Sequence, residues 1–348
     1  MDAQIALLLA QDGLTNGAIY ALLALATVLV FVVTRILFVP QGDFVSLGAL
    51  TLASLQLGKT PGTAWLLIAL AVATAAVEAS AALRARRADR LGRIALARLV
   101  VPVAIAGLAL ALAPRQAPLA IQVAITVALV MPMGAMIYRL AFEPLANASV
   151  LVLLIVAVAV HFCLQGLALA LFGAEGVRTP PFSEARLDAG VLTISGQSLA
   201  VIGASLALIA ALYHFFARSI LGKALRATAV NRIGARLVGI STSLAGRLAL
   251  TLAAGIGAIS GTLVGPIATM YYDSGFLVGL KGFVGAVAGG LVSYPLAAVG
   301  AVFVGLLEAY ASFWSSPLKE VIVFASLVPV LLWLSLRTRH VEEPEEDD

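Results

Sequence analysis

Long apolar runs are the feature that most limits what this chain can fold into. Eleven runs approach or reach the roughly 20 residues that an α-helix needs to cross a bilayer. The runs are continuous and rich in Leu and Ala rather than alternating, so they do not fit barrel strands. They cover about residues 5–33, 36–57, 63–82, 94–113, 119–138, 149–172, 196–217, 244–270, 276–292, 296–314 and 318–336. The sequence therefore predicts an all-α, polytopic membrane helix bundle, in which helices satisfy the backbone polar groups within the lipid.

The composition excludes the other broad classes. Hydrophobic residues make up 61% and charged residues 11% of the 348 residues, against about 45–50% apolar and about 25% charged in soluble domains. Cys163 is the only cysteine, so no intrachain disulfide or cysteine cluster can form. The three histidines, His161, His214 and His340, are too far apart in sequence to form a paired metal motif. We expect no metal site.

Basic residues predict the orientation of the chain in the membrane. Six arginines lie between the third run and the first residues of the fourth, up to Arg98, and six Lys and Arg residues lie between the seventh run and the first residues of the eighth, up to Arg247. An even number of spans separates the two sets, which places both on the same side. Lys and Arg are kept on the cytoplasmic side, so we expect the N-terminus outside and the C-terminus inside. Sixteen of the 22 basic residues are then cytoplasmic, namely the two sets of six with Arg35, Arg139, Arg337 and Arg339. The net charge of +4 thus indicates topology, and no nucleic-acid partner is expected.

Five of the ionisable residues that fall within the apolar runs are candidates for a function, because charge is costly there and often functional. Glu78 is expected at the interface with an arginine partner. His161 is expected to be a hydrogen-bonded packing residue, with a role in a transport pathway as the alternative. Glu308 is equally compatible with a buried polar contact and with a pathway. The other two residues are Asp43 and Lys281.

Glycines at four-residue spacing favour close helix packing. Gly257, Gly261 and Gly265 form a double GxxxG pattern, and Gly285 pairs with Gly289. The absence of side chains lets helix backbones approach each other in lipid. We expect packing within the chain, with an interface between subunits as the alternative.

Three segments carry a more specific pattern. The segment GLTNGAIYAL, residues 13–22, places Asn16 and Tyr20 one turn apart on one helix face. In FVPQGDFVSLGAL, residues 38–50, Pro40 and Gly42 interrupt the helix start beside Asp43. The basic amphipathic segment LGKALRATAVNRIGARLVGIS, residues 221–241, lies between two runs and leads towards a Gly-rich C-terminal part.

Together these segments resemble the LivH-type permease subunits of branched-chain amino acid ABC importers. The matching residues include Gly13, Thr15, Gly17, Tyr20, Ala21 and Leu22 in the first segment, and Phe38, Gly42, Gly48 and Ala49 in the second. Asp43 replaces a glutamate of that family, and Gln41 replaces its usual histidine. Towards the C-terminus the matches are Gly279, Lys281, Phe283, Ala286, Gly289, Gly290, Pro295, Gly300, Gly305 and Glu308.

The resemblance covers residues 13–57 and about 132–336, within a single permease domain of residues 1–340. Residues 63–118 look like a helix pair inserted into the family pattern, and its removal leaves nine spans. We therefore expect nine to eleven transmembrane helices. The Gly-rich stretch 275–300 could contain a re-entrant or broken helix in place of two complete spans. Residues 341–348 form a short acidic tail, which is expected to be a solvated cytoplasmic end.

The resemblance implies that residues 218–243 dock on a separate ATPase. The expected coupling residues match the family string at Gly222, Ala224, Arg226, Ala227, Ala229 and Gly239. A basic amphipathic loop on the lipid surface is the alternative for this segment. The chain itself has no phosphate-binding loop, so ATP would be bound by the partner subunits, and no cofactor is expected here.

The resemblance also implies a solute path through the bundle. A periplasmic binding protein would deliver the solute to a pair of permease subunits, identical or homologous, in a bacterial inner membrane. Asn16, Tyr20, Gln41, Asp43 and Lys281 are the polar candidates along the path, although helix packing explains each of them equally well. The solute could be a branched-chain amino acid, another amino acid, an amide or urea.

Two other functions remain open at this stage. An ion-gradient-driven transporter would use Asp43, Glu78, His161 and Glu308 as relay groups, but no inverted repeat is evident. An integral-membrane enzyme is the least favoured, because no clustered His or Asp motif is present. We therefore expect a transport subunit and not an enzyme.

Overall fold

The computed structural model describes residues 3–85, 91–115, 117–189 and 192–337, and these residues are almost entirely helical. The acidic tail, and residues 86–90 and 116 of the predicted inserted pair, lie outside the described residues. The long helices are α1 (Ala3–Thr34), α3 (Gly62–Arg84), α4 (Leu91–Leu112), α5 (Leu119–Ile137), α6 (Val150–Phe172), α7 (Gly196–Arg218), α10 (Thr242–Val264) and α12 (Tyr294–Trp314). The shorter helices are α2 (Asp43–Gln56), α8 (Ile220–Val230), α9 (Arg232–Leu237), α11 (Ser274–Ala288), α13 (Lys319–Ala325) and α14 (Leu327–Arg337).

The predicted polytopic helical architecture is confirmed, with fewer full-length spans than the expected nine to eleven. Eight helices among the described residues are long and apolar enough to cross a membrane. The runs at 36–57 and 276–292 yield only α2, with 14 residues, and α11, with 15. The last run divides into α13 and α14. The expectation of a broken helix in the Gly-rich stretch therefore fits the structure better than two complete spans.

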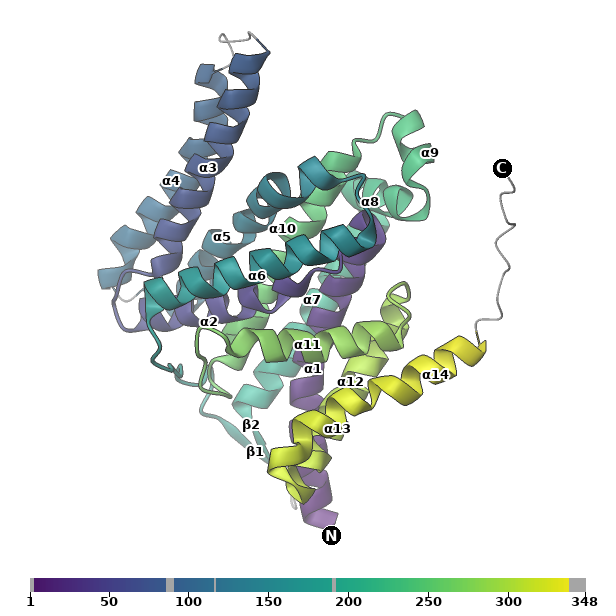
Figure 1. Ribbon diagram of the computed structural model, residues 1–348. Coiled ribbons are helices and arrows are strands. Elements are labelled where there is room, and N and C mark those ends of the chain that lie inside the picture. The colour runs from purple at the N-terminus through teal and green to yellow at the C-terminus, as the bar shows by residue number, and fades with distance from the viewer. Residues whose placement is uncertain (1–2, 86–90, 116, 190–191, 338–348) are drawn as a thin grey trace.

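Helices α1 and α10 form the centre of the bundle (Figure 1). α1 packs against α7, α8, α10, α11 and α12, while α10 also packs against α2 and α5. Ala and Gly line these contacts, so the helix axes come close together. Gly257 and Gly261 of α10 face α2, where an added Cβ would meet Phe44 and the backbone of Val45. The GxxxG pattern of α10 therefore serves packing within the chain.

Helix α2 is short because buried irregular backbone, with a 3-10 turn at Val39–Gln41, precedes it within the same apolar run. α1 ends at Thr34, and Arg35 follows with a φ of 62°, which lies in the left-handed region. The chain then turns back through 36–42 into the bundle. Phe38, Pro40 and Gln41 in this segment are buried. The apolar run at 36–57 thus contains irregular backbone and a 3-10 turn as well as α-helix. Such backbone is tolerated at membrane depth where protein surrounds it.

The first turns of α2 and α11 meet inside the bundle. A Cβ added at Gly42 would collide with the backbone of Gly275, and one added at Gly275 would collide with Gly42. The amide of Gly275 donates to Ser46 Oγ at 2.8 Å. Two discontinuous helices therefore point their N-termini towards one region, as in many transporters.

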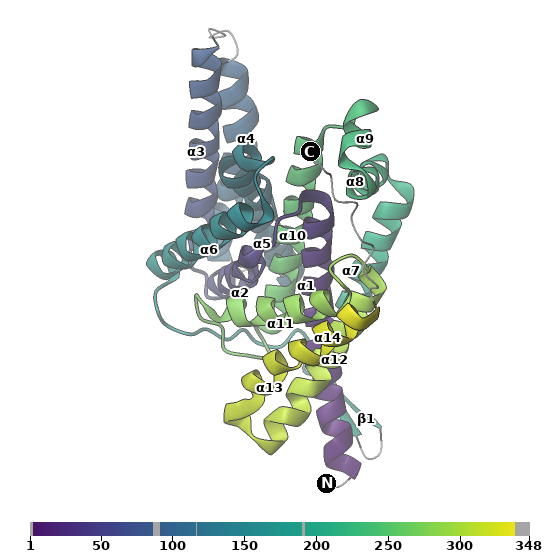
Figure 2. The same cartoon turned by 45° about the vertical axis from the view of Figure 1, so that its right-hand side comes forward.

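The two ends of the bundle differ clearly in Figures 1 and 2. At one end lie α8 and α9, together with the ends of α3 and α4 that flank residues 86–90. We call this the α8 end. At the other lie the start of α1 and an antiparallel hairpin of β1 (Arg186–Ala189) and β2 (Leu192–Ser195). We call this the hairpin end. The described flanks of the first basic set, at the ends of α3 and α4, thus share one end with the second basic set, as the charge pattern predicts.

Candidate functional site

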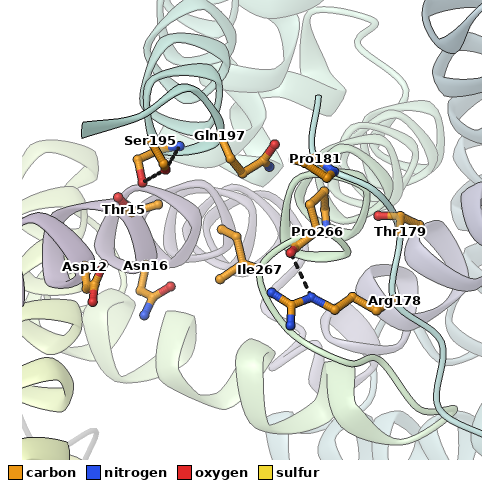
Figure 3. Close-up of a pocket in the computed structure, with 11 residues that line it drawn as sticks. Asp12, Thr15, Asn16, Arg178, Thr179, Pro181, Ser195, Gln197, Pro266 and Ile267 are labelled. Carbon is orange, nitrogen blue, oxygen red and sulfur yellow. Dashed lines mark hydrogen bonds between the residues drawn. The ribbon is translucent and has the colours of Figure 1, made fainter. Parts of the chain in front are cut away.

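A pocket of about 570 Å³ opens between α1, the start of α7 and the loops at the hairpin end (Figure 3). It mixes apolar walls with charged and amide groups, which is the usual make-up of a small-molecule site. Its lining comprises Asp12, Thr15, Asn16, Arg178, Thr179, Pro181, Ser195, Gln197, Ser198, Pro266 and Ile267.

The charged groups lie at opposite ends of this pocket. Figure 3 shows Asp12 and Asn16 at one end, Arg178 at the other, and the apolar side chain of Ile267 between them. Arg178 Nε donates to the carbonyl of Pro266 at 3.1 Å, which fixes the guanidinium against the loop that follows α10. The terminal guanidinium nitrogens can then face a carboxylate, while the Asp12 carboxylate can accept from an ammonium group.

Buried polar residues form the inner wall of the pocket. Gln197 is held by two contacts: its Oε1 accepts from the Phe182 amide at 2.9 Å and its Nε2 donates to the Leu263 carbonyl at 3.3 Å. Thr179 is 4% exposed, and its hydroxyl has no partner among the described residues. A buried hydroxyl without a partner costs free energy. Thr179 Oγ1 is therefore a group that a bound molecule or water could satisfy.

Asn16 is the only one of the five predicted pathway residues that lines this pocket. Tyr20 lies one turn further along α1 and meets Lys281 around Glu308 of α12. The Tyr20 hydroxyl donates to Glu308 Oε2 at 2.5 Å, and Lys281 Nζ donates to Glu308 Oε1 at 2.6 Å. Lys281 also donates to Glu320 at 3.0 Å, which ties α13 to α11. Of the two roles considered for Glu308, the buried polar contact is the one observed.

Gln41 and Asp43 lie at the junction of α2 and α11. Gln41 Nε2 donates to the carbonyl of Ala253 at 3.0 Å, linking the re-entering segment to α10. Both carboxylate oxygens of Asp43 lie 2.9 Å from Nδ1 of His161 in α6. The His161 ring stacks on Phe276 of α11 with centroids 4.5 Å apart. His161 is thus buried and hydrogen-bonded as expected.

The predicted pathway residues are therefore divided among three places: the pocket, the Glu308 cluster and the junction. Local sequence patterns missed Asp12, Arg178, Thr179 and Gln197, which come from α1, the loop before the hairpin and α7 and share no motif. The signal that could have pointed to them is position, since all four lie near the ends of apolar runs on the same predicted side.

The predicted coupling residues all lie on or next to α8 and α9, at the α8 end (Figure 1). Gly222 is buried because α8 starts against the last turn of α7, where a Cβ would meet the Phe215 carbonyl. Gly239 has a φ of 85°, a left-handed conformation that ends α9 and that glycine adopts without strain. Arg226 and Ala227 are exposed, while Ala224 and Ala229 are half-buried.

Large apolar side chains are exposed along the same two helices. Val230 is 89%, Ile233 73% and Leu237 84% exposed. On the opposite side of α8, Leu225 is buried in a cluster with Leu29 and Val33 of α1. The segment therefore has one face anchored to the central helix and one face free to meet another molecule.

Comparison with known proteins identifies the kind of protein. The family model described as a branched-chain amino acid transport system permease component matches residues 9–331. The chain belongs to this family. The permease is 32% identical over 209 residues to the high-affinity branched-chain amino acid transport permease LivH of Salmonella typhimurium, covering 57% of the permease and 67% of LivH. The Escherichia coli LivH is 31% identical over 206 residues, with the same coverage.

A third relative has a different name but a similar extent of match. The permease is 30% identical over 209 residues to BraD of Pseudomonas aeruginosa, covering 58% of the permease and 67% of BraD. No solved structure matches the permease. The expected resemblance is thus confirmed, and the chain is the permease subunit of an ABC importer and a multi-pass membrane protein.

Proposed function

We propose that the permease passes a branched-chain amino acid from a periplasmic binding protein to the cytoplasm, driven by separate ATPase subunits. It would work in a bacterial inner membrane beside a second permease subunit, identical or homologous, and would carry out no chemical reaction itself. ATP would be bound by the partners alone. The α8 end would face the cytoplasm, because it carries the second basic set and the described flanks of the first.

The observation that carries this proposal is the two-sided character of α8 and α9. An element that transmits closure of an ATPase needs an exposed face for docking and a buried face that passes movement on. Val230, Ile233 and Leu237 supply exposed apolar area, and Arg226 adds charge for acidic groups of a partner. Leu225 supplies the link to α1. Surface this apolar in a monomer is typical of an interaction site.

The pocket at the hairpin end supports an amino acid with a branched apolar side chain as the solute. Arg178 offers donors to a carboxylate and Asp12 an acceptor to an ammonium group, while Ile267 gives an apolar surface to a branched side chain. At about 570 Å³ the pocket is larger than a single amino acid needs. We therefore assign it as an entrance through which the solute moves. Asn16, Tyr20, Gln41, Asp43 and Lys281 remain proposed members of the path. Asn16 would line the entrance, Gln41 and Asp43 would shape the α2–α11 junction, and Tyr20 and Lys281 would shape the Glu308 cluster.

The test is coupling between ATP hydrolysis and uptake. Arg226→Glu and Ala227→Arg place charge or bulk on the exposed face of α8, and we expect ATP-driven uptake to fall at least about tenfold while membrane insertion is retained. Arg84→Glu is the matched control, because Arg84 is exposed near the same end on α3. Normal coupling in both α8 variants, or an equal loss in the control, would contradict the docking role.

A further inference from the structure

A second pocket lies between α3, α4, α5 and α10, in the half of the bundle towards the α8 end. Its volume is about 400 Å³. Three of its residues are arginines, each from a different helix or helix end: Arg98 of α4, Arg139 just after α5 and Arg247 of α10. Nothing in the proposed transport cycle uses this pocket, and it is the place where the α3–α4 hairpin joins the rest of the bundle.

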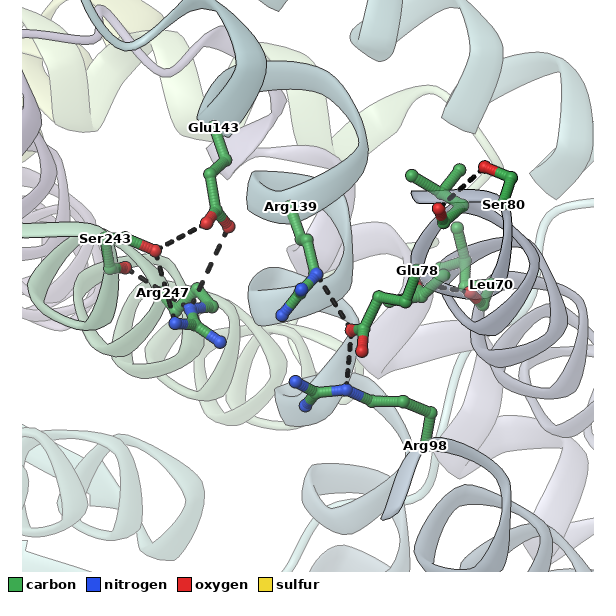
Figure 4. A network of polar contacts seen from close by, with 10 residues as sticks. Leu70, Glu78, Ser80, Arg98, Arg139, Glu143, Ser243 and Arg247 are labelled. Atoms are coloured by element: carbon green, nitrogen blue, oxygen red, sulfur yellow. Dashed lines mark hydrogen bonds and ion pairs between the residues drawn. The ribbon is translucent and has the colours of Figure 1, made fainter. Parts of the chain in front are cut away.

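Glu78 of α3 lies between two of these arginines (Figure 4). Its Oε1 is 2.7 Å from Arg98 Nε and 2.8 Å from Arg139 Nε. This is the arginine pairing expected for Glu78 from the sequence. Both contacts are made by Nε, so the terminal nitrogens of the two guanidinium groups can still donate to another molecule. The carboxylate therefore holds two guanidinium groups close together against their mutual repulsion.

Arg247 is positioned separately, as Figure 4 also shows. It donates from its terminal nitrogen to Ser243 Oγ at 3.2 Å and from Nε to the Ser243 carbonyl at 3.4 Å. Glu143 is its acidic neighbour, with Oε2 3.9 Å from Nε. Three guanidinium groups thus face two carboxylates, which leaves an excess of positive charge around the pocket.

The remaining walls of the pocket are mostly apolar. Val101 and Pro102 come from α4, and Met131, Pro132, Ala135 and Met136 come from α5. Val101 is 58% exposed, so this wall continues onto the outer surface of the bundle, where lipid chains lie in a membrane. A molecule that fits must have an anionic head for the arginines and a long apolar part for this wall.

We propose that this pocket binds one anionic phospholipid of the leaflet at the α8 end. Its phosphate would accept from the terminal nitrogens of Arg98, Arg139 and Arg247, and an acyl chain would run along Val101 and the α5 wall. Basic pockets between membrane helices bind acidic headgroups in this way, and guanidinium groups suit phosphate geometry. The lipid would bridge the α3–α4 hairpin to α5 and α10.

The test is lipid retention by the purified permease. The protein is equilibrated in detergent with equal amounts of phosphatidylglycerol and phosphatidylcholine, and bound lipid is counted by native mass spectrometry. We expect one phosphatidylglycerol molecule to be retained in preference to phosphatidylcholine. Arg98→Gln and Arg247→Gln should each weaken retention by about fivefold, the effect of one basic residue at an anionic surface. Arg84→Gln, exposed on the same hairpin and outside the pocket, should leave retention unchanged.

Two further measurements separate the proposal from its rivals. Ala135→Trp fills the apolar wall without touching a charge, and it should reduce retention by about as much as an arginine variant. Inorganic phosphate at millimolar concentration should not displace the lipid, because it lacks the apolar part. Equal retention of the two lipids, equal loss in Arg84→Gln, or displacement by phosphate alone would overturn the proposal. Arg247 does not pair with Glu78, so its variant keeps the Glu78 contacts that hold the hairpin.

Discussion

At the scale of single residues, Asp43 and His161 are the pair on which the junction of α2 and α11 depends. Asp43 is 3% and His161 4% exposed, and both side-chain contacts of Asp43 given by the structure are to His161. A carboxylate left alone in such surroundings loses its solvation without compensation.

We therefore predict an asymmetry between two substitutions at this pair. His161→Leu leaves a buried carboxylate alone and should lower the free energy of unfolding by about 3–5 kcal/mol. Asp43→Asn keeps a polar partner for the imidazole and should cost about 1 kcal/mol. Denaturant unfolding in mixed micelles measures both values. Similar losses of unfolding free energy in the two variants would show that His161 does not stabilise an ionised Asp43 carboxylate.

A second residue-scale prediction concerns the entrance pocket. Arg178→Gln and Asp12→Asn each remove one charge while keeping side-chain size nearly constant. We expect the concentration of loaded binding protein that gives half-maximal uptake to rise about two- to tenfold, roughly the effect of 0.4–1.4 kcal/mol. Arg186→Gln, on the exposed hairpin and outside the pocket, is the matched control. A pocket variant that behaves like Arg186→Gln would exclude that charge from the path.

Residue partnerships were only partly predictable from the sequence. The arginine partner of Glu78 follows from the cost of an isolated charge in lipid and from the nearby basic loop. The partners of Tyr20 and Lys281 do not, because Glu308 is 288 residues from Tyr20 and 27 from Lys281. Likewise, the sequence does not indicate that Arg178 lines a pocket, because the pocket forms only when the loop of Arg178 folds against Pro266 and α1.

At the scale of elements, the two short helices α2 and α11 are the most distinctive. Their first turns approach so closely that Gly42 and Gly275 face each other without room for a side chain. Pro40 and Gly42 indicated an interrupted helix at this point in the sequence. The length of the irregular segment before α2 was not predictable, because buried irregular backbone is as apolar in sequence as a helix.

We predict that Gly275→Ala separates α2 from α11. The added methyl group meets the Gly42 backbone, which cannot rotate away as a side chain could, so we expect a loss of about 1–3 kcal/mol in stability and reduced uptake. Gly203→Ala is the control, because a Cβ there meets nothing within 4 Å in the middle of α7. That variant should be neutral or gain up to about 1 kcal/mol. Equal behaviour of the two variants would contradict close approach at the junction.

At the scale of the whole molecule, the two ends of the bundle have different chemistry and share one central helix. α1 lines the entrance pocket through Asp12, Thr15 and Asn16, and it meets α8 through Leu29 and Val33. Movement of α8 can therefore reach the entrance along a single rigid element. The apolar runs predicted the helices, and the basic residues predicted that the two basic sets lie at the same end. That α1 lines the pocket near its start and contacts α8 near its end could be learned only from the structure.

The central claim is that an ATPase acting at the α8 end drives the solute through this bundle. It is tested most directly by leucine uptake into proteoliposomes that contain the permease, its partner subunits and the binding protein, with ATP supplied on the α8 side. The account predicts uptake that requires both ATP and the binding protein and persists after ionophores collapse the proton and sodium gradients. Uptake that proceeds without ATP and disappears with the gradients would contradict it.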